Sequence, residues 1–232
     1  MVKAFNKQGQ DKIDWCDYSW NPVSGCLHGC SYCYLIRMGY DMTPRFHAER
    51  LNRFHEIKEK SAKIFVGSAA DMFGEWVIVD WIEAVLADIN KHSEHTFQLL
   101  TKNPERYKYW DWRKYKNVWI GTTLDTQARA NKNLQFLKET KANLKFISFE
   151  PLLEEINIDL TGINWIIIGA NSNYDAEKPK QEWADKLIAQ ARELGIAVWM
   201  KDNFKYAKKI KEFPKINWLV GQAKILSFVE NR

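Results

Sequence analysis

The chain has 232 residues, a net charge of +5 and 46% hydrophobic residues. This composition allows a single domain with a substantial core and argues against wholesale disorder. No run approaches the ~18 apolar residues of a membrane span, and the N-terminus lacks the apolar segment of a signal peptide. We therefore expect a cytoplasmic protein without a membrane partner. The mild positive charge permits a nucleic-acid or nucleotide substrate without requiring one.

The first chemical signal along the chain is a group of three cysteines. Cys26, Cys30 and Cys33 have the spacing CxxxCxxC. In a reducing compartment, thiolates so close together indicate a zinc or iron–sulfur site rather than disulfide bonds. A cubane cluster has four irons, so three cysteines would leave one iron open to a ligand. The remaining cysteine, Cys16, is expected to be a small buried hydrophobe; the alternative is a fourth ligand that closes the open position.

This cysteine spacing, with Tyr32 directly before the last cysteine, resembles the signature of the radical S-adenosylmethionine (radical SAM) superfamily. The resemblance implies that the three cysteines hold a 4Fe–4S cluster and that the open iron chelates the amino and carboxylate groups of S-adenosylmethionine. It also implies that Tyr32 lies near the adenine. In that superfamily the cysteine loop follows the first strand, which would lie here within residues 13–20.

Downstream of the cysteines, short apolar runs alternate with helical stretches. Continuous β-branched and aromatic runs at this spacing are typical of buried parallel strands. The six runs are 64–67, 97–100, 118–121, 146–149, 165–169 and 197–200.

Strands that alternate with helices in this way predict an α/β protein with a parallel sheet, and a barrel or an open doubly wound sheet would both satisfy the pattern. The resemblance favours a partial, TIM-barrel-like (β/α) barrel. We expect one domain over residues 1–232, with a core at about 11–202 and a basic C-terminal extension over 203–232.

Helix signals fall between these runs. Asp80, with Glu83 three residues later, predicts an N-cap with a capping box. A second helix is predicted over residues 126–138. An apolar stripe from Trp183 to Leu194 predicts a third helix, which Gly195 would end in the left-handed conformation.

Polar residues follow the predicted strands, and the carboxyl ends of parallel strands form the edge where α/β proteins bind ligands. The ammonium of S-adenosylmethionine needs acceptors, for which Ser68 and Asp71 are candidates. Many radical SAM enzymes have a Gly-Gly-Glu-like segment at this place, and residues 67–71 here lack its glutamate. The ribose needs a hydroxyl or carboxylate, and its candidates are Thr122, Thr123, Asp125 and Glu150.

Two lysines are the cations among these strand ends. Lys102 and Lys201 could each hold the cofactor carboxylate or a substrate phosphate, or could pair with Asp71 or Glu150. We expect Lys102, Glu150 and Lys201 to act in catalysis. His28 lies in the cysteine loop but at no ligand position, so no role is assigned to it.

Two basic segments allow two interpretations each. Residues 106–115 mix bases with aromatics, a composition that can stack nucleobases but also suits a helix with an aromatic face on the barrel. The tail from Phe204 onward could close one end of the barrel, but we favour a solvated helix face.

The resemblance extends over roughly residues 11–202 to a phage-associated family of radical-SAM-like proteins without an assigned function. It departs after Gly169, where residues 170–172 replace a more usual Gly-Glu-Ser. The matching motifs are Trp20-Asn21-Pro22, Gly25-Cys26, Asp71-Met72-Phe73, His95 to Lys102, Glu150 to Leu153 and Trp165 to Gly169.

The resemblance thus implies a radical SAM enzyme. It would cleave S-adenosylmethionine reductively to a 5′-deoxyadenosyl radical that abstracts hydrogen from a substrate, and a nucleic acid or nucleotide is our first candidate. An electron donor such as flavodoxin or ferredoxin is implied. The alternative is a non-catalytic module in which Cys16 joins the other three cysteines around zinc or an iron–sulfur cluster, for structure or nucleic-acid binding.

Overall fold

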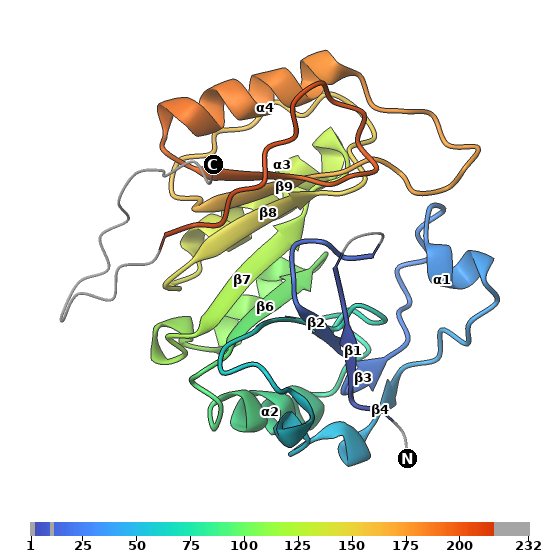
Figure 1. Ribbon diagram of the computed structural model, residues 1–232, viewed down its shortest axis with the longest axis vertical. Helices are drawn as coiled ribbons and strands as arrows, with labels where there is room; N and C mark the ends of the chain where they lie inside the picture. Colours follow the sequence, from blue (N-terminus) through green and yellow to red (C-terminus); the bar gives the residue numbers. More distant parts are fainter. Residues whose placement is uncertain (1–2, 10–11, 216–232) are drawn as a thin grey trace.

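The strands lie across the main sheet in the same order as along the chain. The structure is a computed structural model that describes residues 3–9 and 12–215. The sheet order is β1-β2-β5-β6-β7-β8-β9-β10, visible in Figure 1 as a progression of colours from blue to red. The strands are β1 (Phe5–Lys7), β2 (Tyr18–Trp20), β5 (Lys63–Val66), β6 (Thr96–Thr101), β7 (Val118–Thr123), β8 (Lys145–Phe149), β9 (Trp165–Ile168) and β10 (Ala197–Met200).

This order settles the fold class. Apart from the antiparallel pair β1–β2, neighbouring strands are parallel. A doubly wound sheet would reverse its strand order at a switch point, and no reversal is present. Within the described residues β1 and β10 are the two edges of the sheet, so the single-domain fold is a partial (β/α) barrel, as predicted. The strand predicted within residues 13–20 is β2, and all six apolar runs form strands where the sequence predicts them. The strand β1, which precedes β2, was not predicted.

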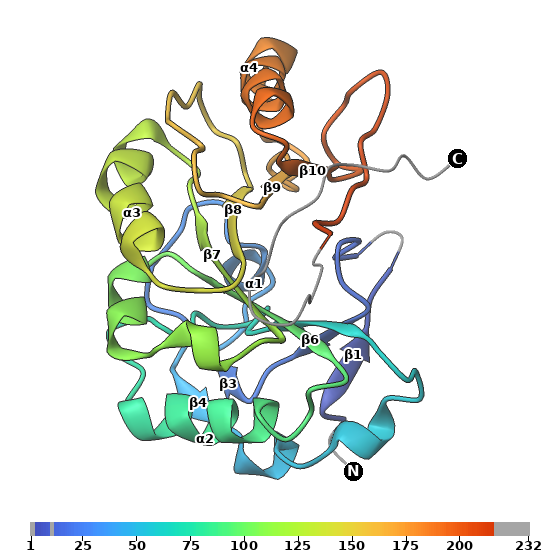
Figure 2. The same cartoon turned by 90° about the vertical axis from the view of Figure 1, so that its left-hand side faces the viewer.

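Three helices cover the outer face of the sheet: α2 (Val79–Ile89), α3 (Gln127–Glu139) and α4 (Gln181–Glu193). Figure 2 shows them following one another around the outside of the strands. The Thr126 hydroxyl caps α3 by accepting a bond from the Arg129 amide at 3.2 Å. Gly195, at φ +67°, follows the end of α4 as predicted. No helix among the described residues has the length and apolar character needed to cross a bilayer.

The predicted start of α2 is wrong. Its N-cap is Ile78, without a side-chain cap bond, and Asp80 lies in the first turn. Asp80 can still favour the positive end of the helix dipole there. Glu83 forms no capping box because its carboxylate accepts a hydrogen bond from Trp110 Nε1 at 2.5 Å. A contact 27 residues away along the chain thus replaces the local one.

The remaining elements are short. A small antiparallel ribbon pairs β3 (Val23–Ser24) with β4 (Arg45–Phe46). One turn of helix, α1 (Tyr34–Arg37), follows the cysteines. The 3₁₀ helices are η1 (Ala48–Arg50), η2 (Phe54–Glu56), η3 (Pro104–Tyr109) and η4 (Trp112–Lys114).

The basic aromatic segment 106–115 forms η3 and η4 and packs mostly inward. Tyr107 and Trp112 are completely buried. The Arg106 guanidinium donates to the carbonyls of Gly74 and Val77. Most of this segment therefore supports the sheet, and only Tyr109 is a largely exposed aromatic within it. The interpretation as aromatic packing is supported over a stacking surface for nucleobases.

The buried side chains form two separate clusters, because successive side chains of a strand point to opposite faces of the sheet. One cluster packs under the helices, and the other is an aromatic cluster inside the barrel. We call this second cluster the aromatic floor, and its principal rings are Trp15, Phe65, Trp119, Phe146, Trp165 and Trp199.

Residues after β10 complete this floor. Among residues 203–215 there is no helix, so the solvated helix face that we favoured is not observed. Met200 N donates to Ile210 O at 2.7 Å, and Glu212 N donates to Val198 O at 2.9 Å. The Phe213 ring then lies 4.7 Å from that of Trp199. The rest of the predicted extension, 216–232, lies outside the described residues.

The two ends of the sheet are joined at one point, which we call the seam. Lys211 forms ion pairs with Asp14 and with Asp202. Trp199 Nε1 donates to Asp14 Oδ1 at 3.2 Å. The segment before β2 therefore contacts the strand β10 and the segment that follows it.

Candidate functional site

The cysteine loop starts at a position that only glycine can occupy. Gly25 has φ +85°, and a Cβ there would lie 2.3 Å from the carbonyl oxygen of Thr43. Gly25 N donates to Ala69 O, and Cys26 N donates to Met42 O, both at 3.0 Å. These bonds fix the loop beside the end of β5.

The three cysteines of the loop line one cavity. It has a volume of about 240 Å³ and also contains Tyr32, Lys102 and Glu150. All three cysteines are half-buried. A larger cavity of about 800 Å³ shares Cys26, Lys102 and Glu150 with it and extends down to Trp15 of the aromatic floor. The carboxyl ends of the strands therefore enclose a site with the cysteines at its edge.

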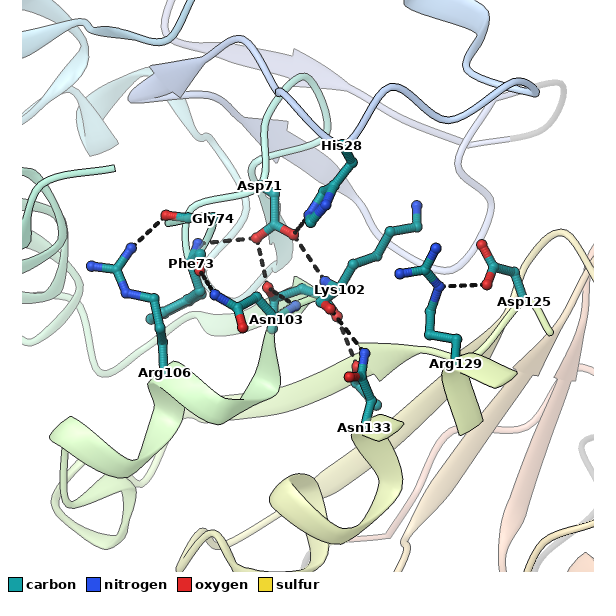
Figure 3. A network of polar contacts seen from close by, with 12 residues as sticks. His28, Asp71, Phe73, Gly74, Lys102, Asn103, Arg106, Asp125, Arg129 and Asn133 are labelled. Atoms are coloured by element: carbon teal, nitrogen blue, oxygen red, sulfur yellow. Dashed lines mark hydrogen bonds and ion pairs between the residues drawn. The ribbon is translucent and has the colours of Figure 1, made fainter. Parts of the chain in front are cut away.

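Asp71 contacts the cysteine loop through His28, and Figure 3 shows the two side chains facing each other. His28 Nε2 lies 2.7 Å from Asp71 Oδ2. The other donors to this carboxylate are Thr101 Oγ1 (2.6 Å), Phe73 N (3.0 Å) and Lys102 N (2.8 Å). Because a carboxylate has about four acceptor positions, these contacts leave none for a cofactor ammonium.

Asp71 is ionised in this setting. Its burial alone would raise the pKa of the carboxyl group, but the hydrogen bonds from His28, Thr101 and the Lys102 amide outweigh burial, and the pKa lies below its usual range. A buried carboxylate with all its acceptor positions filled is a structural hub. It joins the loop after β5 to the end of β6.

Asp125 holds the second aromatic side chain of the loop. Tyr32 Oη donates to Asp125 Oδ2, and Arg129 Nε donates to Asp125 Oδ1 at 2.5 Å. Burial, and next the bond to Asp125, raise the pKa of Tyr32 far above its usual value, so its hydroxyl stays protonated. Lys102 Nζ lies 5.1 Å from the centre of the Tyr32 ring, a cation–π contact. No ion pair of Lys102 occurs among the described residues.

Glu150 and Lys201 meet across Gly169. They follow β8 and β10 and form an ion pair in which both side chains are largely buried. A Cβ at Gly169 would lie 3.1 Å from both the Glu150 Cγ and the Lys201 Cδ. The absence of a side chain on the strand between them therefore lets the pair form above β9.

The other predicted residues separate into two groups. Ser68 lines both cavities, and its hydroxyl donates to Asn21 Oδ1 at 3.2 Å. Thr123 lines the larger cavity. Thr122 is fully buried and donates to the Thr101 carbonyl at 2.9 Å, and it lines neither cavity. Its hydroxyl therefore links strand β7 to strand β6.

The fourth cysteine does not join the other three. Cys16 belongs to the aromatic floor, where its thiol contacts the Ile13 carbonyl at 3.6 Å. Burial raises its pKa, as expected for a structural thiol. In the described part of the chain, no three His, Cys, Asp or Glu side chains converge to hold a metal ion, and this includes the three cysteines of the loop. Cys16 lines neither cavity, so the alternative of a four-cysteine site, zinc or iron–sulfur, is not supported.

Three soft thiol donors share one cavity without a fourth cysteine, a donor set that suits an iron–sulfur cluster. Burial raises the pKa of the Cys26 thiol to about 11, so metal binding must displace its proton. Cys26, Cys30 and Cys33 are the residues that would hold the cluster.

Several residues of the site could not be identified from the sequence. His28 and Asn133 contact partners 43 and 31 residues away, His28 the Asp71 carboxylate and Asn133 the Lys102 carbonyl. No local pattern encodes such contacts. The pairing of Arg129 with Asp125 could have been predicted from the sequence, because the two residues have the i,i+4 spacing of a helical ion pair.

Solved structures with a similar fold are those of spore photoproduct lyase. One, a cysteine-to-serine mutant, aligns with a TM-score of 0.61 and 12% identity over 87% of this chain and 80% of that chain. A complex with dinucleoside spore photoproduct aligns with a TM-score of 0.51 and 11% identity over 97% of this chain and 71% of that chain. A mutant with bound AdoMet and the same dinucleoside gives a TM-score of 0.52 and 11% identity over 96% and 71%. At this identity the likeness shows the fold.

No curated protein matches the chain significantly. Residues 10–218 match the family described as "Protein of unknown function (DUF5131)". This match covers the barrel, the cysteine loop and the seam, and the chain therefore belongs to the DUF5131 family.

Proposed function

We propose that this protein is a radical SAM enzyme. One observation carries the proposal: the three cysteines of CxxxCxxC line one cavity at the carboxyl ends of the strands, and that cavity opens into a larger one inside the barrel. A cluster bound there would adjoin a space of about 800 Å³, which suits a cofactor together with a substrate.

The similar structures support the same choice of cofactor and substrate class. Spore photoproduct lyase is described with bound AdoMet and with dinucleoside spore photoproduct. By analogy of fold, we propose S-adenosylmethionine as the cofactor here and a nucleotide or nucleic acid as the substrate. A flavodoxin or ferredoxin as electron donor and an association with phage are further proposals from the sequence.

When bound, the cluster would supply the electron that cleaves S-adenosylmethionine to a hydrogen-abstracting radical. The residues of the chain bind and orient the reactants around it. Lys102 brings an ammonium without an acidic partner among the described residues, so it is suited to a carboxylate or phosphate. Tyr32, whose face Lys102 covers, lies at the edge of the same cavity.

Glu150 and Lys201 have a different role from Lys102. They neutralise each other in the wall of the larger cavity, where Lys201 Nζ donates to Glu150 Oε1. We propose that this pair contacts the substrate, because either member can exchange its partner for a polar substrate group. Ser68 and Thr123 add hydroxyl groups to the cavity wall. We propose a structural role for Asp71, Thr122 and Asp125, which were predicted to bind the cofactor, because their side chains make hydrogen bonds within the protein.

Anaerobic reconstitution with iron and sulfide tests the proposal. The wild-type protein should gain broad absorbance near 400 nm that changes when S-adenosylmethionine is added, and with strong reductant it should release 5′-deoxyadenosine. Cys30→Ala should lose both properties. Cys16→Ala is the matched control and should retain both, because Cys16 lies in the aromatic floor. Cleavage by Cys30→Ala, or a colourless wild-type protein that holds zinc, would refute the assignment.

The substrate class needs a separate test. Single-stranded and duplex oligonucleotides of DNA and RNA are each added to the reconstituted enzyme, and both the 5′-deoxyadenosine and the oligonucleotide mass are measured. A mass change in one oligonucleotide class supports the proposal. Turnover of a small metabolite with no effect of any nucleic acid would contradict it.

A further inference from the structure

We infer that Asp71 and Asp125 are positioning residues that fold the cysteine loop into its ligand-ready shape before any cluster binds. They do so by holding His28 and Tyr32, the two loop side chains on either side of Cys30. The inference rests on the proposed function only for what the loop is shaped to hold.

The middle of the loop lacks other anchors. The main chain is tied to neighbouring segments at Gly25 and Cys26, and α1 begins after Cys33. Between these points, within the part of the chain that the structure describes, no main-chain hydrogen bond links residues 27–32 to another segment. The one main-chain hydrogen bond that this stretch does make lies within the loop, where Cys33 N donates to Cys30 O at 3.0 Å. Cys30 therefore depends on side chains for its place.

The anchor for His28 is rigid. Asp71 is 5% exposed, and the main chain at Phe73 and Lys102 donates to its two oxygens. Figure 3 shows this carboxylate between His28 and the chain at Lys102. The His28 ring also lies edge-on against Trp76, with ring centres 4.8 Å apart. One hydrogen bond and one ring contact thus fix the imidazole.

The anchor for Tyr32 comes from the next part of the barrel. Asp125 is 1% exposed, lies at the end of β7 and pairs with Arg129 in the first turn of α3. Thr126, the next residue, caps that helix. The Tyr32 hydroxyl is therefore bound to a carboxylate whose own position is set by a strand end and a helix start.

The two anchors act from different directions. Asp71 follows β5 and Asp125 follows β7, so the loop is bound to two separate points on the carboxyl edge. A loop held at only one of them could turn about that point. Both contacts join a neutral or cationic donor on the loop to a buried carboxylate, the strong class of hydrogen bond. The geometry points to a loop whose thiols are arranged in the metal-free protein.

The test uses the metal-free full-length chain. Cys30 is labelled with iodoacetamide, and the rate is read from the loop peptide by mass spectrometry. Tyr32→Phe removes one oxygen and no formal charge, and the hydroxyl that it removes also bonds to the Cys30 sulfur. Loss of that bond would disfavour the thiolate and slow labelling, so faster labelling in this variant reports a loosened loop. We expect labelling at least about 10-fold faster in Tyr32→Phe and in Asp71→Asn, the size expected for one lost charge-assisted bond. Asp88→Asn, which alters a buried carboxylate on α2 that accepts from the Asn52 amide, should label like wild type.

A double-mutant cycle separates a specific contact from general loosening. His28→Ala and Asp71→Asn should not add, because each removes the same bond, whereas His28→Ala and Tyr32→Phe should. His28→Gln keeps a donor and should label more slowly than His28→Ala. If Asp71→Asn does not fold, the loop variants His28→Ala and Tyr32→Phe still decide the question. Wild-type labelling rates in both would overturn the inference.

The reconstituted variants give an independent readout. Tyr32→Phe should shift the electron paramagnetic resonance spectrum or the reduction potential of the cluster, whereas Asp88→Asn should leave both unchanged. Labelling of the metal-free chain does not require S-adenosylmethionine cleavage. If the proposed function fails, the variants will still label faster than wild type, but the reconstituted wild type will release no 5′-deoxyadenosine. If this inference fails, the wild-type enzyme will be active, but the variants will label at the wild-type rate.

Discussion

Glu150 and Lys201 form an ion pair directly above Gly169, at the carboxyl ends of three adjacent strands. The two side chains are 22% and 12% exposed. Removal of one partner would leave the other charged group poorly solvated, whereas removal of both would not. The stabilities of the single and double variants can therefore isolate the contribution of this ion pair.

Lys201→Met should lower the free energy of unfolding by about 1–3 kcal/mol, because the Glu150 carboxylate loses its partner. The double variant with Glu150→Gln should recover part of this loss. Urea unfolding followed by circular dichroism measures both. Equal stability of Lys201→Met and wild type would mean that solvent already compensates the pair.

The Cys26 thiol should react unusually slowly in the metal-free protein. Burial raises its pKa from 9.0 to about 11, so at pH 8 its thiolate fraction is roughly 100-fold below that of an ordinary thiol. Because the raised pKa keeps the proton on the folded protein, labelling should rise about tenfold per pH unit between pH 7 and 10. Metal loading should improve over the same range. A labelling rate that levels off near pH 9 would contradict this assignment.

Phe213→Ala should loosen the aromatic floor. The Phe213 ring lies 4.7 Å from Trp199 and 5.5 Å from Trp165, and Lys63 Nζ lies 4.4 Å above it. We expect a loss of about 2–3 kcal/mol in unfolding free energy and a red shift of tryptophan emission. Tyr174→Ala is the control, because Tyr174 is 93% exposed and should leave both unchanged.

Tyr107→Phe should destabilise the protein without affecting any contact with nucleic acid. The buried Tyr107 hydroxyl lies 3.1 Å from the Leu99 carbonyl and 2.9 Å from the Gly121 carbonyl. Its loss leaves buried carbonyl groups with fewer partners and should cost about 1–2 kcal/mol. Tyr109→Phe, at an exposed position, should be neutral in thermal unfolding. A drop in oligonucleotide binding for Tyr107→Phe alone would contradict the inward packing of this segment.

The strands β5 to β10 were predictable because each contains a short, mostly apolar run that is largely buried. The strand β1 was not, because its sequence Phe-Asn-Lys is largely exposed. The start of α3 was predictable because Thr126 caps it locally. The role of Asp71 was not, since its partners at His28 and Thr101 are 43 and 30 residues away. A polar residue at a strand end can bind a ligand or hold a loop, and only the three-dimensional position of the donors decides between these uses.

The tail was misjudged for a related reason. Lysines such as Lys208 and Lys209 favour an exposed helix when they are considered as charges alone. The chain there instead pairs with the open edge of β10, and Lys211 binds Asp14 and Asp202. An unpaired strand edge attracts a further extended segment, and which segment reaches it depends on the whole topology.

The seam has a consequence for biosynthesis. Ribosomes make the cysteine loop early, but Trp199 and Lys211, which contact Asp14, come about 170 to 180 residues after Cys30. Domains fold from their N-terminal side as they emerge, so the nascent chain carries exposed thiols beside an unfinished barrel for most of its translation. The surroundings of the three cysteines are therefore complete only after β10 has been made, and a ribosome stalled before that strand would present a chain with thiols open to oxidation.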